Sequence, residues 1–149
     1  MDMRKKPWRQ QLSFYRFTTP LQTRYAYMDS ERHVNNVAVI GLHLEARSRF
    51  HLELLGRDHW LAHTRTIRTA RFDNYLLRIT HYPAAITAGV NVIDVSERDY
   101  TLAIGLFQDG TCVGLHECCM GAWADGKRIG LPAALHARLM EAGAVQEPA

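Results

Sequence analysis

The sequence lacks a long uninterrupted apolar run, and this excludes two classes of protein at once. No segment approaches the roughly 18 consecutive apolar residues that a membrane-spanning helix needs. The basic N-terminal region, residues 1–20, contains no apolar stretch of the kind that a signal peptide requires. We therefore expect no secretory signal and no membrane partner.

Cysteine is also scarce. The three cysteines are odd in number, two of them are adjacent, and none is in a C-x-x-C spacing: Cys112, Cys118 and Cys119. Neither a disulfide framework nor a zinc site follows from this arrangement, so we predict reduced thiols in a cytoplasmic protein. His59 and His63 are four residues apart, but no third ligand is evident. We expect no metal and no cofactor.

Charge of one sign is not strongly in excess. The net charge is +3, and charged residues make up 22% of the chain. This balance suits a small anionic ligand but is too weak for a nucleic-acid binder. The basic cluster Arg4, Lys5, Lys6 and Arg9 lies in residues 1–15, which we interpret as a solvated, partly mobile extension with Trp8 and Phe14 as anchors.

The remaining length suits one domain, at residues 16–141, followed by a C-terminal tail at residues 142–149. Residues 36–55 have the clearest helical periodicity, with Asn35 as a candidate N-cap and Gly56 beyond the end. The predicted apolar face contains Val37, Val39, Ile40, Leu44, Ala46, Phe50, Leu54 and Leu55.

Strands are predicted around this helix at residues 16–27, 64–76, 86–92, 100–107 and 111–123. Asp109-Gly110 and Asp125-Gly126 are typical of two-residue hairpin turns, and residues 132–140 could form a short helix. The order indicates an α+β domain with an antiparallel sheet. One helix covers only one face of such a sheet and leaves edges free, so we predict a homo-oligomer, a dimer or a tetramer.

The segment from Met28 to Asn36 places a carboxylate, an imidazole and two amides before the helix N-terminus. Free N–H groups and the positive end of the helix dipole suit a carbonyl oxygen that becomes negative during a reaction. An adjacent Asp29 could attack that carbonyl or activate a water. The structural alternative, in which Asp29 and His33 cap a loop and Asn35 caps the helix, explains the same residues.

Four short motifs, in their order and spacing, resemble the acyl-CoA thioesterase family that includes 4-hydroxybenzoyl-CoA thioesterase. They are Asp29, then His33-Val34-Asn35-Asn36, then Glu45-Ala46-Arg47, then Leu54-Leu55-Gly56. The resemblance implies a hotdog fold, with an antiparallel sheet wrapped around one long central helix and active sites at a subunit interface. It implies Asp29 as nucleophile or general base, the Asn36 N–H as the group that polarises the carbonyl, and His33 and Asn35 as loop residues that shape the site.

Three positions depart from the family pattern. Arg32 stands where the family usually has Gly, Ser96 to Asp99 replaces a Gly followed by two Ser, and Asn91 stands where many relatives carry Arg. These departures leave Asp29 in place but leave the substrate open.

Several arginines are candidates for ligand contact. Arg65, Arg68 and Arg71 could meet the phosphates of CoA or simply face solvent. Arg47 falls within the apolar arc of the helix, where a charge must be paired or reach water.

The predicted function is therefore hydrolysis of an acyl-CoA to a free acid and CoA, with an acyl-carrier protein as the alternative carrier. A non-catalytic acyl-CoA-binding protein of the same fold stays open because of Arg32 and the altered Ser96 to Asp99 segment. An enoyl-CoA hydratase is a further alternative, although this chain has Glu31-Arg32 where such hydratases typically have Asn-Pro.

Overall fold

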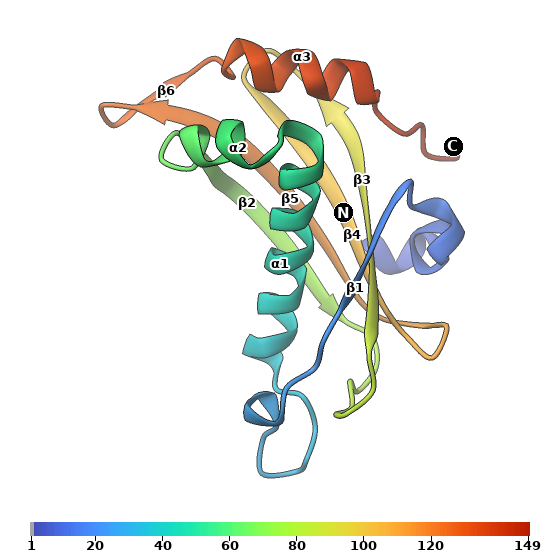
Figure 1. Cartoon of the computed structure of the whole chain (residues 1–149). Helices are drawn as coiled ribbons and strands as arrows, with labels where there is room; N and C mark the ends of the chain where they lie inside the picture. Colours follow the sequence, from blue (N-terminus) through green and yellow to red (C-terminus); the bar gives the residue numbers. More distant parts are fainter. Residues whose placement is uncertain (1) are drawn as a thin grey trace.

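The computed structural model describes residues 2–149 and shows a curved antiparallel sheet of six strands around one long helix, α1 (Asn36–Leu55) (Figure 1). The sheet order is β1-β3-β4-β5-β2, and β6 pairs with β5. The strands are β1 (Phe17–Leu21), β2 (Ile67–Leu76), β3 (Ile86–Val95), β4 (Asp99–Gln108), β5 (Thr111–Ala124) and β6 (Lys127–Ile129). This is the α+β hotdog fold that the sequence predicted.

Helix α1 has the predicted limits because both of its ends carry local signals. The Asn35 side chain accepts the N–H of Ala38 at 2.8 Å, and Gly56 ends the helix with a φ of 77°. The buried stripe is narrower than the predicted apolar face, since Val37 is 81% exposed and Leu44 is also exposed. Two imidazoles take inward positions instead; the buried residues are Val39, Leu42, His43, Ala46, Phe50, His51 and Leu55.

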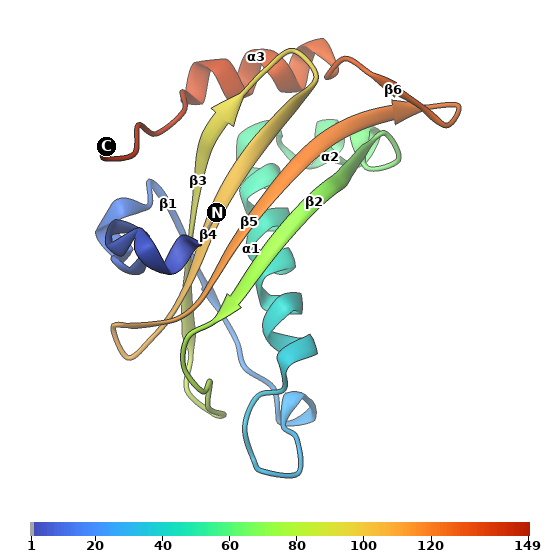
Figure 2. The same cartoon turned by 180° about the vertical axis from the view of Figure 1, so that it is seen from behind.

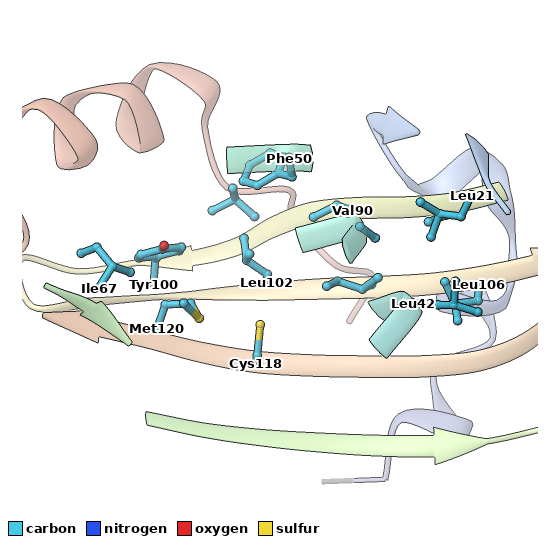
Figure 3. Packing of buried hydrophobic residues seen from close by; sticks show 14 of the residues in the cluster. Leu21, Leu42, Phe50, Ile67, Val90, Tyr100, Leu102, Leu106, Cys118 and Met120 are labelled. Carbon is cyan, nitrogen blue, oxygen red and sulfur yellow. The ribbon is translucent and has the colours of Figure 1, made fainter. Parts of the chain in front are cut away.

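The core lies between α1 and the concave face of the sheet. Figure 3 shows how side chains of α1 meet those of the central strands there. The contributing residues include Leu42 and Phe50 of α1, Val90 of β3, Leu102 and Leu106 of β4, and Cys118 and Met120 of β5. The long helix is therefore held by tertiary packing on the sheet, which positions its N-terminus at one end of the sheet.

Two predicted elements differ in extent. The first strand ends at Leu21 rather than Tyr27 because its partner Ile86 is the first residue of β3; Tyr25–Tyr27 form a 3-10 helix instead. A second helix, α2 (Arg57–His63), follows Gly56 directly, in a stretch for which we predicted no helix or strand. Trp60 anchors α2 by stacking on His51, with ring centroids 4.0 Å apart.

Both predicted hairpin turns are confirmed. Asp109 and Gly110 have φ values of 52° and 76°, and Asp125 and Gly126 have values of 50° and 74°. Two consecutive positive φ values are what a type I′ turn requires. The second turn leads into the short strand β6, and helix α3 (Ala133–Ala142) covers the predicted C-terminal helix.

The expected N-terminal extension packs on the sheet and is only partly solvated, since Arg4 and Lys5 are exposed whereas Arg9 is buried. Three short 3-10 helices, Met3–Lys5, Pro7–Gln10 and Leu12–Phe14, pack on the outer face of the sheet, opposite α1 (Figure 2). Arg9 is only 1% exposed because its guanidinium bonds to Glu117 and Glu147. Burial opposes ionisation of Glu147, but hydrogen bonds from Arg9, Lys6 and Trp8 hold its pKa at about 2.

The C-terminal residues beyond α3 pack on the same outer side as the N-terminal helices. The Val145 N–H donates to the Val92 carbonyl, and Glu147 reaches Lys6 and Arg9. The limits of the hotdog domain, 16 and 141, stay a prediction. Within residues 2–149, no helix is both long and apolar enough to cross a membrane.

Candidate active site

A closed loop carries Asp29 to the start of α1. Met28 and Val34 form an isolated antiparallel bridge, and the Asp29 N–H donates to the His33 carbonyl at 2.8 Å. The Arg32 N–H donates to the Asp29 carbonyl at 3.1 Å. These bonds within a few residues define a tight turn that leads directly into the helix.

The Asp29 carboxylate is exposed, and only one of its two oxygens accepts hydrogen bonds from the loop. Its Oδ1 accepts the N–H groups of Glu31 at 2.9 Å and of His33 at 3.1 Å. Its Oδ2 has no hydrogen-bond partner among residues 2–149. One oxygen thus orients the side chain while the other is available to a ligand.

The N-terminus of α1 offers free donors beside this carboxylate. The Ala38 and Val39 N–H groups are satisfied by the side chain and carbonyl of Asn35. Within the described part of the chain, the N–H groups of Asn36 and Val37 have no acceptor. Donors of this kind, at the positive end of a helix, suit an oxyanion.

A cavity of about 300 Å³ joins these groups to the end of the sheet. It is lined by Asp29, His33 and Val34 of the loop, by Asn36 and Val39 of α1, and by the residues at and after the end of β2. These last are Leu76, Leu77, Arg78, Ile79 and Thr80. The cavity brings a carboxylate, free backbone donors and apolar walls together, which is what acyl transfer from a thioester needs.

His33 and Asn35 have different surroundings. Asn35 uses both ends of its amide for structure, because Nδ2 donates to the Tyr27 carbonyl at 2.8 Å while Oδ1 caps the helix. His33 is partly exposed, lines the cavity and packs edge-on against His81. Asn35 therefore supports the loop, and His33 forms part of the wall.

None of the three arginines predicted to meet CoA phosphates lines the cavity beside Asp29. Arg65 and Arg68 are exposed outside it, and Arg71 lies between Asp73 and Glu117 at 3.9 and 4.0 Å. The arginine at the cavity is Arg78, which sequence reasoning missed. The sequence did contain a signal that could have identified Arg78, because this residue directly follows the apolar pair Leu76-Leu77 at the end of a predicted strand.

At two of the positions that depart from the family pattern, the residues support the fold and do not line the cavity. Ser96 to Asp99 form the turn between β3 and β4, at the end of the sheet opposite Asp29 (Figure 1). Asn91 is buried, accepts the Arg16 N–H at 2.7 Å and donates to the Phe14 carbonyl at 2.7 Å. Neither segment belongs to the cavity that contains Asp29.

Residues 2–149 contain no group of three His, Cys, Asp or Glu side chains arranged to hold a metal ion. His59 and His63 both lie on the short helix α2, without a third ligand.

No protein-family model matches the chain, and no curated protein matches its sequence. Solved structures do match. A thioesterase from Thermus thermophilus complexed with coenzyme A and Zn has 19% identity and a TM-score of 0.75, over 86% of this chain and 94% of that one. A Staphylococcus aureus protein in complex with CoA has 14% identity and a TM-score of 0.77, over 93% and 90%.

A third match is a 1,4-dihydroxy-2-naphthoyl-CoA thioesterase from Synechocystis, with 11% identity and a TM-score of 0.74, over 84% of this chain and 96% of that one. These likenesses establish the fold. Identities this low leave the reaction to be argued from the chain's own residues.

Proposed function

We propose that this protein hydrolyses acyl thioesters of CoA, with Asp29 carrying the chemistry. The observation that carries the proposal is that Asp29, whose Oδ2 is free, and Asn36, whose N–H has no acceptor in the described chain, line one cavity. That two structures of this fold hold CoA supports CoA as the carrier.

The thioester carbonyl oxygen would lie at the helix N-terminus, where the Asn36 N–H stabilises the negative charge of the tetrahedral intermediate. Asp29 would then act in one of two ways. As nucleophile, its Oδ2 attacks the carbonyl carbon, the C–S bond breaks, and water hydrolyses the resulting anhydride. As general base, it takes a proton from the water that attacks the carbonyl. Either route consumes one water and releases a carboxylic acid and the CoA thiol.

Arg78 is the cationic group placed to meet the anionic carrier, because it is exposed at the rim of the Asp29 cavity. A guanidinium binds phosphate well through paired N–H donors. We assign it this contact ahead of Arg65, Arg68 and Arg71, for which phosphate contact stays a prediction.

The test is the Asp29→Asn variant, which keeps an oxygen able to accept the Glu31 and His33 N–H groups while removing the charge. We expect kcat/KM to fall at least about a hundredfold, which corresponds to about 2.7 kcal/mol of barrier. The measurement is thiol release, followed with a chromogenic thiol reagent, on short, medium, long and aromatic acyl-CoAs.

The matched control is Glu31→Gln, in the same loop, because the Glu31 side chain is 79% exposed and takes no part in the cavity. It should retain wild-type turnover. Native turnover by Asp29→Asn would refute the role of Asp29. Tight acyl-CoA binding by the wild type without turnover of any substrate would favour the non-catalytic binding protein.

A further inference from the structure

A second hollow lies next to the Asp29 cavity along the seam between α1 and β2. It measures about 470 Å³ and has apolar walls formed by Ile40, Leu44 and Phe72. Phe72 is four residues from Leu76, which lines the Asp29 cavity, and the two side chains point to the same side of β2. The two hollows therefore follow one another along the seam; we call the second one the α1–β2 crevice.

The α1–β2 crevice contains positive charge and no carboxylate. Arg47 and Arg71 line it, and no Asp or Glu does. Arg71 already has Asp73 and Glu117 near its guanidinium, whereas Arg47 forms no ion pair within residues 2–149.

Arg47 lies beside neutral groups, the Thr69 hydroxyl and the Cys118 thiol. Its Nη1 donates to the Thr69 hydroxyl at 2.8 Å, and that hydroxyl points on toward the Met120 sulfur at 3.6 Å. Two positions along the helix, Arg49 is fully partnered by Glu45 at 2.9 Å and by the Pro20 carbonyl at 2.9 Å. A half-buried guanidinium without a counter-ion costs free energy, so a site of this kind favours an anion.

The spacing fits a ligand that reaches from one hollow to the other. Arg47 is eleven residues beyond Asn36, and a rise of about 1.5 Å per residue puts it roughly 16 Å along the helix axis from the oxyanion donors. That is the reach of a medium to long acyl chain, and the walls between the two points are apolar.

We infer that Arg47 is a specificity residue for acyl groups that end in an anion. In this arrangement the thioester lies at Asp29, the methylene chain lies along the α1–β2 crevice, and Arg47 binds a terminal carboxylate. The inference rests on the proposed thioesterase function, and it names the substrate class as CoA monothioesters of dicarboxylic acids.

The test compares two substrates of equal length, decanoyl-CoA and the CoA monothioester of decanedioic acid, and repeats the comparison with the octanoyl and dodecanoyl pairs. The measured quantity is the ratio of kcat/KM for the two members of a pair. Because both values come from the same preparation, partial unfolding cancels in the ratio.

We expect the wild type to favour the dicarboxylic member by at least about tenfold for the pair whose length matches the seam. Arg47→Met should abolish the preference, and Arg47→Lys should restore part of it. Arg49→Met, the matched control on the same helix, should keep the wild-type ratio because Arg49 lies outside the crevice.

Equal turnover of both members by the wild type would overturn the inference and leave the thioesterase proposal standing. An unchanged kcat/KM ratio in Arg47→Met would also overturn it. If that variant instead changed the mass measured by sedimentation, Arg47 would be a contact for a second copy of the chain. Failure to hydrolyse any acyl-CoA would overturn the proposed function itself.

Discussion

Arg32 departs from the family pattern, yet the turn beside Asp29 closes around it. Its φ is 64°, in the left-handed region that favours Gly, the residue that the family pattern has there. For an L-residue this conformation is about 1–2 kcal/mol less favourable than the right-handed one. The Arg32 N–H nevertheless donates to the Asp29 carbonyl, so the turn is kept at an energetic cost. The departure therefore gives little support to a non-catalytic protein.

We expect Arg32→Gly to raise the free energy of unfolding by about 0.5–1 kcal/mol, the relieved strain less the extra unfolded-state entropy of Gly. Urea denaturation measures the change. Ser30→Gly is the matched control in the same loop, at a position without a positive φ, and it should lower stability. Equal destabilisation by both substitutions would show that Arg32 is not strained.

At the scale of elements, α1 packs on the sheet through imidazoles as well as aliphatic side chains. His43 and His51 of α1 and His116 of β5 are all buried, and the His43 and His116 rings stack with centroids 5.0 Å apart. Burial, reinforced by the charge of Arg47, lowers the pKa of His51 to about 3 and that of His116 to about 4. Burial, reinforced by His116, takes the pKa of His43 well below its usual value.

These three side chains make stability depend on pH. They stay neutral in the folded chain, while in the unfolded chain each takes up a proton near pH 6.5. Because the folded pKa lies below the unfolded one, their full contribution is present above about pH 6.5 and is lost as the pH falls. We expect the free energy of unfolding to decrease by up to about 1.4 kcal/mol per pH unit for each imidazole.

Replacing one of the three should flatten that dependence. In denaturation curves between about pH 7.5 and 5, His43→Leu should reduce the slope by up to about 1.4 kcal/mol per pH unit. His59→Leu, on the exposed side of α2, should leave the slope as it is in the wild type. Parallel curves for His43→Leu and the wild type would contradict the assignment.

At the scale of the whole molecule, the two sheet edges differ in their capacity to pair with another chain. The edge strand β1 has five residues and contains Pro20, which has no N–H to donate. The edge strand β2 (Figure 2) has ten residues and no proline. Its apolar side chains Phe72 and Leu76 are exposed. We therefore propose a homodimer formed through β2. Residues 2–15 already cover part of the outer face of the sheet, which favours a dimer over a tetramer built on that face.

Sedimentation equilibrium should give twice the mass of the chain. Phe72→Lys places a charge on the exposed edge and should shift the protein toward monomer. Met140→Lys makes the same kind of change at an exposed residue of α3 and should leave the mass unchanged. A monomeric wild type, or a dimer that Phe72→Lys does not weaken, would exclude this edge as the interface.

The sequence by itself determined the features that depend on interactions between residues only a few positions apart. The limits of α1 follow from the Asn35 cap and Gly56, and the hairpin turns follow from two Asp-Gly pairs. The approach of Asp29 to the helix start is equally local, because the bonds that shape its loop join residues at most a few positions apart.

Only the tertiary structure decided which charged side chains are buried and which reach the cavity. Arg9 is buried because it pairs with Glu117 and Glu147. These partners lie 108 and 138 residues away in the sequence, so no local pattern predicts the burial. Arg78 lines the cavity, rather than Arg65 or Arg68, because the end of β2 meets the start of α1 there. A charge is buried or exposed according to its neighbours in space, and the periodicity of a single segment contains no information about them.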